Sequence, residues 1–596
     1  MDRNTIIGFV LIALVLMVWM SMNAPPPQPA LTAADSAAVK HKMADSIRQA
    51  AVVAPQAAVA APVDTLGKYF TQLSAGEKKT LTIETGLYRA VLTTKGGGIR
   101  TWELKRFLTW DQHPVNFLDP AEGGDFSLLF YSGDGKVINT KNLTFTSSFA
   151  QDQTVTLAEH DSAVVEYTLT VAPGSRIVKT LVFHGGTYSF DAYYRFEGMQ
   201  SVISNFEYQV VWESPLRYDE HNSIDESNHA KSASYAGGEL TEADATDFDS
   251  HIHKTISGRV SWVAMRNKYF VVAIIPHEKE SQGAELDGMK AHMPDKGAKE
   301  SYNIALKMPY TGKQLETDHF QVYLGPLDFD IIKGFNVELD KIMSLGYAWV
   351  IRPISEYVII PTFKVLHMVI PNYGFVLILF SFLVKLVLYP LTKTSMQSMR
   401  KMQALQPMMT EIREKYKDDP QKMNQQVMRL YKEYGVNPAG GCLPLVLQMP
   451  ILYALWSVFS STIELRQASF MFWIHDLSVP DVIAHLPFQI PLFGIDKLSG
   501  LALLMGITMF VQQKMSVQDP RQKMMVWMMP LMMTLLFNSF PAGLNLYYFM
   551  FNVLSIAQQA WMNKQHKGEP LQKVEEKKSS GGIFTKIAKN LPKLKE

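Results

Sequence analysis

GFVLILFSFLVKLVLYPL, residues 374–391, is an 18-residue apolar run that contains one charged side chain, Lys385. As a helix rising ~1.5 Å per residue it would extend about 27 Å, close to the thickness of a bilayer's hydrocarbon core. Five other stretches have a comparable length and composition, at 6–22, 443–461, 498–513, 524–540 and 542–561. The sequence therefore predicts a multi-domain membrane protein with an α-helical bundle of six transmembrane helices, one at the N-terminus and five in a core over 372–561.

The first apolar stretch lies in a segment, 1–23, that is either a membrane anchor or a cleaved signal. Bulky Met22 stands where a signal peptidase needs a small residue, and Pro25-Pro26-Pro27 follows shortly after it. These features favour an uncleaved anchor. Residues 24–63 are rich in Ala and Pro and poor in large apolar side chains, so we expect an extended linker.

Residues 64–340 have the pattern of a β-sheet domain. Short apolar or alternating runs such as AVVEYTLTV (163–171) and YFVVAIIP (269–276) are separated by turns such as Lys95-Gly96-Gly97-Gly98. This pattern predicts a large antiparallel β-sandwich. The polar segment 217–250 is expected to interrupt it as a long surface loop.

Residues 341–371 are apolar but carry interspersed charges, and Pro353 and Pro361 interrupt them. An amphipathic segment at the membrane interface fits this pattern better than a span.

Positive charges indicate the orientation of the core. Segment 392–442 contains nine Lys and Arg residues and the tail 562–596 contains nine more, whereas the loop 462–497 contains only Arg466 and Lys497. Because basic loops stay in the cytoplasm, both termini are predicted to be cytoplasmic and the sandwich to lie outside.

The cytoplasmic segment 393–436 is predicted to be a helical hairpin. Its apolar residues recur at spacings of three and four, and Asp418-Asp419-Pro420 separates two such runs. Pro407 is expected to bend the first helix.

Lys385 needs an explanation, because a lysine near the bilayer centre costs roughly 2.5–3.5 kcal/mol on insertion scales. It could snorkel to the interface, or it could face a water-filled groove. Other polar side chains at bilayer depth favour the groove; they are Ser381, Gln448, Gln512, Asn545, Asn552 and Ser555. Since no intramembrane Asp or Glu accompanies them, the groove would attract polar or acidic passengers.

Several classes of protein are disfavoured. GxSxG, Walker A and HExxH motifs are missing, and the single cysteine, Cys442, excludes a cysteine-based zinc site or cluster built on this chain alone. His251-Ile252-His253 has no third ligand at a useful spacing and is interpreted as a surface strand end. We therefore expect no catalytic residues, no metal and no cofactor, and the net charge of +1 gives no argument for binding DNA.

Two alternatives remain open beside a protein-handling groove. A small-molecule or ion transporter or channel would need inverted repeats or an ion site, and the sequence has no internal repeat. A periplasmic carbohydrate-active enzyme tethered to the membrane would need the sandwich for its activity. The basic tail 562–596 could attract ribosomal RNA or anionic phospholipids, or could simply be a solubilising cytoplasmic tail.

Several short motifs occur in a specific order across 374–561. They are Tyr389-Pro390-Leu391-Thr392-Lys393, Lys401-Met402-Gln403, Leu405-Gln406-Pro407, Asn437-Pro438, Gly440-Gly441-Cys442-Leu443-Pro444, Gln448-Met449-Pro450 and Pro541-Ala542-Gly543-Leu544. In this order they resemble the YidC membrane protein insertases, in particular the Gram-negative type with a large periplasmic domain.

The resemblance implies a five-helix core with a hydrophilic groove that is open to the cytoplasm and lipid and closed towards the periplasm. Lys385 matches the groove's positive charge, which is usually Arg in the family. Met449, Pro450, Tyr547 and Tyr548 match positions that contact the substrate helix. The sandwich would be periplasmic and galactose-mutarotase-like, and 341–371 would lie at the periplasmic interface.

The function implied is insertion and folding of nascent inner-membrane proteins, alone or with the Sec translocon, without enzymatic activity. Implied partners are nascent membrane proteins, phospholipids, the Sec translocon and, through the tail, the ribosome. The segment 480–497 is longer than the usual loop of the family, and the resemblance gives it no role.

Overall fold

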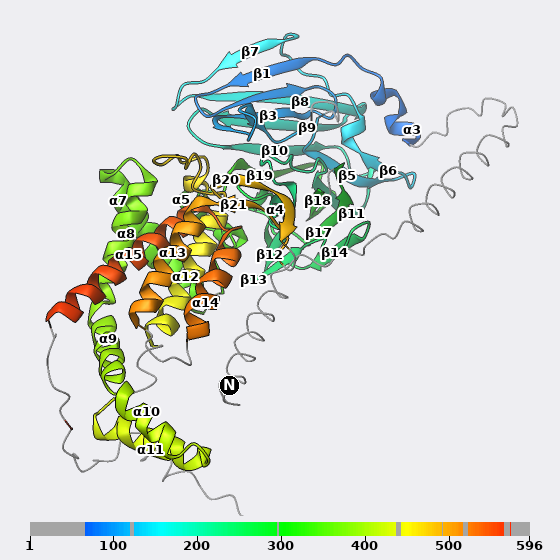
Figure 1. Cartoon of the computed structure of the whole chain (residues 1–596). Helices are drawn as coiled ribbons and strands as arrows, with labels where there is room; N and C mark the ends of the chain where they lie inside the picture. Colours follow the sequence, from blue (N-terminus) through cyan, green and yellow to red (C-terminus); the bar gives the residue numbers. More distant parts are fainter. Residues whose placement is uncertain are drawn as a thin grey trace, which may run out of the picture. The chain divides into compact units, whose positions relative to one another are not determined.

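A computed structural model describes residues 66–119, 124–294, 297–347, 349–436, 443–490, 493–516, 523–565 and 573 (Figure 1). The predicted anchor 1–23, the linker 24–63 and most of the tail 562–596 lie outside these residues.

Three sheets make up the β domain over 80–326. The five-stranded sheet has the order β4-β3-β2-β1-β7, with β1 (Thr80–Glu84), β2 (Tyr88–Thr93), β3 (Gly98–Leu108), β4 (Pro114–Asn116) and β7 (Gln153–Thr156). The eight-stranded sheet has the order β13-β12-β15-β16-β19-β10-β9-β8, with β8 (Ser162–Ala172), β9 (Ser175–His184), β10 (Ser189–Glu197), β12 (Lys231–Ala236), β13 (Glu239–Ala243), β15 (Val260–Arg266), β16 (Phe270–His277) and β19 (Leu315–Pro326). The six-stranded sheet has the order β14-β17-β18-β11-β5-β6, with β5 (Ser127–Ser132), β6 (Val137–Asn139), β11 (Ile203–Trp212), β14 (His251–Ser257), β17 (Gly283–His292) and β18 (Ala298–Pro309).

The predicted antiparallel β-sandwich is confirmed, with one parallel pair, β1 and β7, at the edge of the five-stranded sheet. Alternation explains the packing of β10, where every second residue is buried, whereas β16 is apolar and buried on both faces over most of its length. Trp102 of β3 stacks on Tyr88 with 4.0 Å between ring centroids, and its Nε1 donates to the carbonyl of Leu324 in β19 at 3.0 Å. This contact joins the five-stranded and eight-stranded sheets.

The expectation that 217–250 is a loop is wrong. The segment contains α4 (Ser223–Ser227) and the hairpin β12–β13, which forms one edge of the eight-stranded sheet. The β12 sequence, KSASYA, has small side chains and low hydropathy, yet Ser232 and Ser234 are fully buried. This strand forms because it pairs with β15. A strand that depends on its neighbour in this way need not show an apolar pattern in its own sequence.

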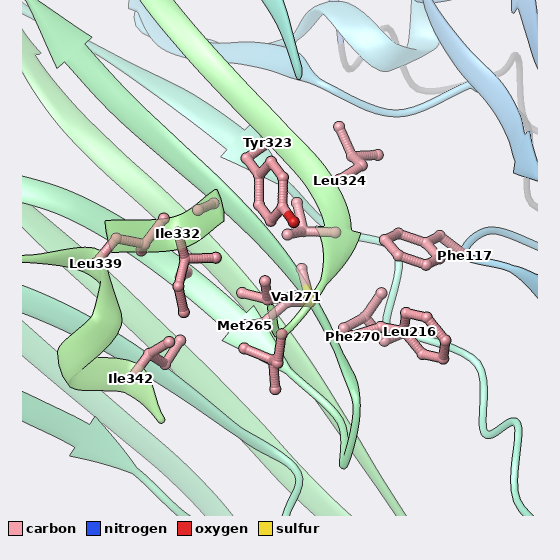
Figure 2. Packing of buried hydrophobic residues seen from close by; sticks show 14 of the residues in the cluster. Phe117, Leu216, Met265, Phe270, Val271, Tyr323, Leu324, Ile332, Leu339 and Ile342 are labelled. Carbon is pink, nitrogen blue, oxygen red and sulfur yellow. The ribbon is translucent and has the colours of Figure 1, made fainter. Parts of the chain in front are cut away.

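Residues after β19 connect the sandwich to the helices. Helix α5 (Phe329–Lys333) and a single turn over Leu339–Ile342 bury Ile332, Leu339 and Ile342 against the sheet (Figure 2). The Arg266 guanidinium donates to the carbonyl of Ile342 at 3.0 Å. The sandwich core therefore continues into the segment that leads to the first of the later helices.

The helices follow in sequence order, beginning within the predicted interfacial segment 341–371 (Figure 1). They are α6 (Ile351–Ile354), α7 (Ile360–Val369), α8 (Tyr373–Val387), α9 (Tyr389–Ala404), α10 (Gln406–Lys415), α11 (Pro420–Glu433), α12 (Leu443–Ser461), α13 (Gly500–Ser516), α14 (Lys523–Phe537) and α15 (Ala542–Gln565). A π-helical turn over Ser355–Ile359 connects α6 to α7.

The run 374–391 is not one helix, as the sequence had suggested. Helix α8 ends at Val387, and α9 begins at Tyr389 with a bend of 67° between them. Pro390 explains the break, because proline lacks the N–H that would continue the ladder and its ring clashes with the preceding turn. Among the described residues, α8 and α9 together have the length and hydropathy to cross a membrane as a bent pair, whereas no helix meets that test alone.

Helices α10 and α11 pack against each other around a small apolar cluster of their own. Its buried members are Leu405, Met409, Leu430, Tyr431, Tyr434 and Val436. Pro407 lies at the start of α10, next to the break between α9 and α10. The later part of the periodic pattern, from Met402 to Tyr434, therefore forms the contact between these two helices.

Candidate functional site

Lys385 lies in the last turn of α8 and is 8% exposed. Its ammonium donates to Ser555 Oγ of α15 at 2.8 Å and lies 4.8 Å from the centre of the Phe551 ring. The Ser555 hydroxyl in turn donates to the backbone carbonyl of Phe551 at 2.7 Å. Within the described part of the chain, no carboxylate pairs with Lys385. The ammonium therefore has three N–H donors, and its contacts are one hydroxyl and the face of one aromatic ring.

The other predicted polar residues of α15 tie this helix to its neighbours. Asn545 Nδ2 donates to the carbonyl of Phe537, at the end of α14, at 3.1 Å. Asn552 Nδ2 approaches Thr508 Oγ1 of α13 at 3.5 Å. Together with Ser555, these residues form a polar stripe that contacts α14, α13 and α8 in turn.

Among the described residues, no hydrogen bond joins Lys385 to Ser381, Gln448 or Gln512. Ser381 is fully buried one turn earlier on α8, where its hydroxyl donates to the carbonyl of Ile378 at 2.6 Å. Gln448 of α12 interacts with Tyr548. Gln512 of α13 is half-buried, and its backbone carbonyl accepts from Ser516. Of the predicted polar set, Ser555 is thus the residue that hydrogen-bonds the positive charge.

The sequence reasoning missed one member of the polar stripe. Gln559 is buried four residues after Ser555, and its side chain exchanges hydrogen bonds with the Ser516 hydroxyl at the end of α13. The spacing of Asn552, Ser555 and Gln559, three and then four residues, could have revealed it.

The predicted substrate-helix contacts are in two different environments. Met449 and Pro450 of α12 line an apolar hollow of about 290 Å³ together with Tyr453, Tyr347, Trp349, Val350 and Ile351. Tyr547 is fully buried between Phe380 and Phe551, and Tyr548 is half-buried against Phe537. Met449 is exposed at the surface, whereas Tyr547 is enclosed between α8 and α15.

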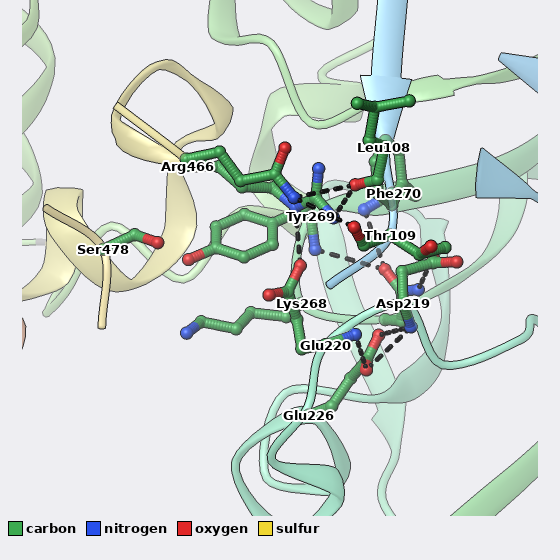
Figure 3. A network of polar contacts seen from close by, with 12 residues as sticks. Leu108, Thr109, Asp219, Glu220, Glu226, Lys268, Tyr269, Phe270, Arg466 and Ser478 are labelled. Atoms are coloured by element: carbon green, nitrogen blue, oxygen red, sulfur yellow. Dashed lines mark hydrogen bonds and ion pairs between the residues drawn. The ribbon is translucent and has the colours of Figure 1, made fainter. Parts of the chain in front are cut away.

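The loop that follows α12 contacts the sandwich through Arg466 (Figure 3). The guanidinium pairs with Glu220 at 2.5 Å and donates to the carbonyl of Leu108 in β3 at 2.6 Å. It also lies over the rings of Tyr269 and Phe270, 5.7 and 5.4 Å from their centres. Both charged side chains are almost fully buried, with exposed fractions of 2% for Arg466 and 9% for Glu220.

Two further acids lie beside this ion pair. The Glu226 carboxylate accepts the backbone N–H groups of Asp219 and Glu220 at 2.9–3.1 Å. Burial raises the pKa of Asp219 to about 7 and raises the pKa of Glu226 well above its ordinary value. The contact between the loop and the sandwich therefore contains two carboxyl groups whose pKa values burial raises.

No cluster of three or more His, Cys, Asp or Glu side chains in the described ranges could hold a metal ion. The predicted strand end at His251 is the start of the edge strand β14, where His253 Nδ1 lies 2.7 Å from Asp287.

Comparison with known proteins covers both parts of the chain. The family model described as "60Kd inner membrane protein" matches residues 365–569, and that described as "YidC periplasmic domain" matches 80–355. The membrane protein insertase YidC of Chlorobaculum tepidum is 42% identical over 94% of this chain and 95% of its own length. The protein of the same description from Pelodictyon phaeoclathratiforme is 42% identical over 95% of each chain.

Two solved structures show weaker likeness. An active YidC insertase crystal structure is 18% identical, covering 82% of this chain and 93% of that chain, with a TM-score of 0.35. A galactose mutarotase related enzyme from Lactobacillus acidophilus is 11% identical, covering 41% of this chain and 97% of that chain, with a TM-score of 0.25. At these scores neither likeness supports a conclusion, and the mutarotase-like character of the sandwich stays a prediction.

The two family matches agree in chain order with the two parts of the structure, the sandwich and the helices that follow it. The identity to full-length relatives extends across both parts and favours neither a transporter nor a tethered enzyme. The chain belongs to the YidC family of membrane protein insertases.

Proposed function

We propose that Lys385 is the fixed positive charge of a groove that receives the polar external segment of a nascent inner-membrane protein. The observation that carries this proposal is the ammonium's environment: it is buried, with Ser555 as its hydrogen-bond acceptor and no carboxylate of the described residues beside it. A buried charge with unfilled donors is costly. Acceptors on an incoming chain, or the water that accompanies it, would fill them.

Admission of a passenger requires α8 and α15 to separate, because Lys385 is 8% exposed when they are packed. Separation would break the contact of Lys385 with Ser555 and free both groups for the passenger. The water-filled groove opened in this way would be lined by Ser381, Asn552 and Gln512, with Gln448 and Asn545 at its edges. An acidic external segment gains most from this arrangement, since its carboxylates can pair with the ammonium.

The apolar part of the passenger would leave along a different surface. Met449 and Pro450 line an open apolar hollow, so a hydrophobic helix can pack there while its polar segment is held near Lys385. Tyr547 and Tyr548 would join this flank once α15 has moved. Burial of the passenger helix in lipid supplies the driving force.

This function requires a specific topology, which we propose from the distribution of Lys and Arg residues between the loops. The chain would cross the inner membrane six times, with both termini and the hairpin 393–436 in the cytoplasm and the sandwich in the periplasm. The anchor 1–23 would hold the N-terminus, and the linker 24–63 would connect it to the sandwich. The segment 341–371 would lie at the periplasmic interface.

The partners follow from the same arrangement. Nascent membrane proteins are the passengers, and phospholipids surround the helices. The basic tail 562–596 would attract the ribosome, and the protein would act alone or beside the Sec translocon. No step needs DNA, a metal or a cofactor.

The decisive experiment compares Lys385→Ala, Lys385→Arg and Lys393→Ala in liposomes with passengers whose external tails are acidic, neutral or basic. Lys393 is an exposed lysine on α9 and serves as the matched control. We expect Lys385→Ala to reduce insertion of the acidic passengers several-fold and the others less, with Lys385→Arg retaining most activity. Normal insertion of every passenger by Lys385→Ala would overturn the proposal.

A further inference from the structure

A hairpin of unusual composition separates α12 from α13. It consists of β20 (Val482–Ile490) and β21 (Ile495–Ser499), paired antiparallel with His485 opposite Lys497. The β20 sequence is VIAHLPFQI, in which His485 is the one titratable side chain. Phe488 is 61% exposed, and Val482 and Ile483 are exposed as well.

The base of this hairpin is held firmly to the ends of the helices. The Asp481 carboxylate accepts from the backbone N–H of Leu501, in the first turn of α13, at 2.7 Å and from Trp473 Nε1 at 2.8 Å. Asn538, after α14, donates to the carbonyl of Lys497 at 2.7 Å and accepts the N–H of Ser499 at 2.9 Å. The hairpin therefore projects from a fixed point at the start of α13.

Water is a poor environment for such an element. A two-stranded hairpin alone is marginally stable in water, and most of β20 is exposed. An exposed apolar strand with unpaired backbone groups is also a template for unwanted pairing with other chains. A charged or polar strand would be expected here if the hairpin faced solvent.

The surface next to the hairpin indicates what covers it. Leu503, Ile507 and Val511 are exposed along α13 at spacings of four, so they form one apolar stripe that begins just after the base of β21. The family description for this region is that of an inner membrane protein, and an exposed apolar stripe on such a protein suits contact with lipid. Exposed Phe472 precedes Trp473, which is bonded to the same Asp481 that holds the hairpin. The apolar surface thus continues from the helix stripe past the helix end.

We propose that the β20–β21 hairpin lies in the interfacial layer of the periplasmic leaflet, with phospholipid as its partner. Phe488, Ile483 and Val482 would enter the acyl boundary, where aromatic and aliphatic side chains are favoured. Headgroups and interfacial water would satisfy the backbone groups that β20 leaves unpaired. The hydrocarbon core could not do this, so the hairpin must lie at the interface. The proposal rests on the membrane location of the family and, for the choice of leaflet, on the topology proposed above, but not on the groove at Lys385.

The single cysteine of the chain makes a site-specific test possible. A nitroxide is attached to Phe488→Cys in a Cys442→Ser background, and the full chain is reconstituted in vesicles of phosphatidylethanolamine and phosphatidylglycerol. Ile507→Cys on the α13 stripe is the lipid reference. Val164→Cys, on β8 of the sandwich where the side chain is 66% exposed, is the water reference. Collision rates with oxygen and with a water-soluble nickel chelate are measured at each site.

At residue 488 we expect the label to collide more often with oxygen than with the chelate. The label at 507 should show the same preference, and the label at 164 the reverse. A profile like that of 164 would place the hairpin in water and overturn the proposal. Low collision rates with both reagents would show cover by protein, and dipolar broadening between labels would show a second copy of the chain; either result also overturns it. Insertion activity measured on the same vesicles keeps this outcome separate from the role of Lys385.

Discussion

Lys385 Nζ donates to Ser555 Oγ across 2.8 Å, which ties the one charged residue of α8 to the polar stripe of α15. The two residues are 170 positions apart in the sequence. Because the hydroxyl is the ammonium's acceptor, this bond links α8 to α15 in the packed state. Under the proposed function a passenger would replace it.

Replacing Ser555 with Ala should destabilise the helical part by about 1–3 kcal/mol, because it leaves a buried charged donor without its partner. The same replacement in a Lys385→Met background should cost much less, since the charge is then absent. Thermal unfolding of the four variants of this double-mutant cycle in detergent measures the coupling. Additive effects of the two substitutions would show that the bond does not contribute to stability.

The ion pair between Arg466 and Glu220 should be important for the contact between the α12–α13 loop and the sandwich. Arg466→Ala leaves a nearly buried carboxylate unpaired, and we expect a loss of about 3–5 kcal/mol. Arg259 and Glu280 form a matched exposed pair, with side chains 72% and 68% exposed, and Arg259→Ala should cost about 0–1 kcal/mol. Chemical denaturation of the full chain measures both variants. Equal effects would mean that the Arg466 pair is solvated in solution.

Stability should also depend on pH through Asp219. Burial raises the pKa of this carboxyl from 3.8 to about 7, with Glu226, Glu220, Arg217, Arg466 and Asn267 as its neighbours. The folded chain therefore binds more protons than the unfolded chain between pH 4 and 7. Its free energy of unfolding should fall as the pH rises through that window and level off above it.

The variant Asp219→Asn keeps the side-chain oxygen that accepts from Asn267 but cannot titrate. Its stability should fall less between pH 4 and 7 than that of the wild type, as measured by denaturant titrations at each pH. Parallel curves for the two proteins would refute a raised pKa at Asp219.

The sequence showed the features that depend on local composition and periodicity. Long apolar runs identified the later helices, alternation identified most strands, and the burial cost of a charge singled out Lys385. The break at Pro390 was also visible locally, but the apolar run continues across it, so hydropathy alone extended the helix too far.

Contacts between distant segments could not be predicted in the same way. Nothing near Arg466 in the sequence indicates that Glu220, 246 residues away, supplies its counter-charge. Strand β12 forms through its pairing with β15, and its own small side chains do not indicate a strand. The order of residues along α15 could have revealed Gln559, but its partner Ser516 on α13 follows only from helix packing.

Tyr547 allows packing and passenger contact to be separated. Its ring is fully buried against Phe380 and Phe551, and its hydroxyl makes no hydrogen bond with any residue that the structure describes. If the side chain serves only to pack α8 against α15, Tyr547→Phe should leave stability and insertion nearly unchanged. Tyr547→Ala should cost about 3–5 kcal/mol by leaving a cavity.

If the hydroxyl meets the passenger after the helices separate, Tyr547→Phe should instead reduce the rate of insertion while the thermal unfolding midpoint stays the same. Insertion kinetics and unfolding of the two variants, measured in parallel, decide between these roles. The proposed groove expects the second result, because a buried hydroxyl without a partner gains a hydrogen bond only when α8 and α15 open. An unchanged rate of insertion in Tyr547→Phe would show that the Tyr547 hydroxyl does not contact the substrate. Met449 and Pro450 would then remain as the apolar flank of the proposed groove.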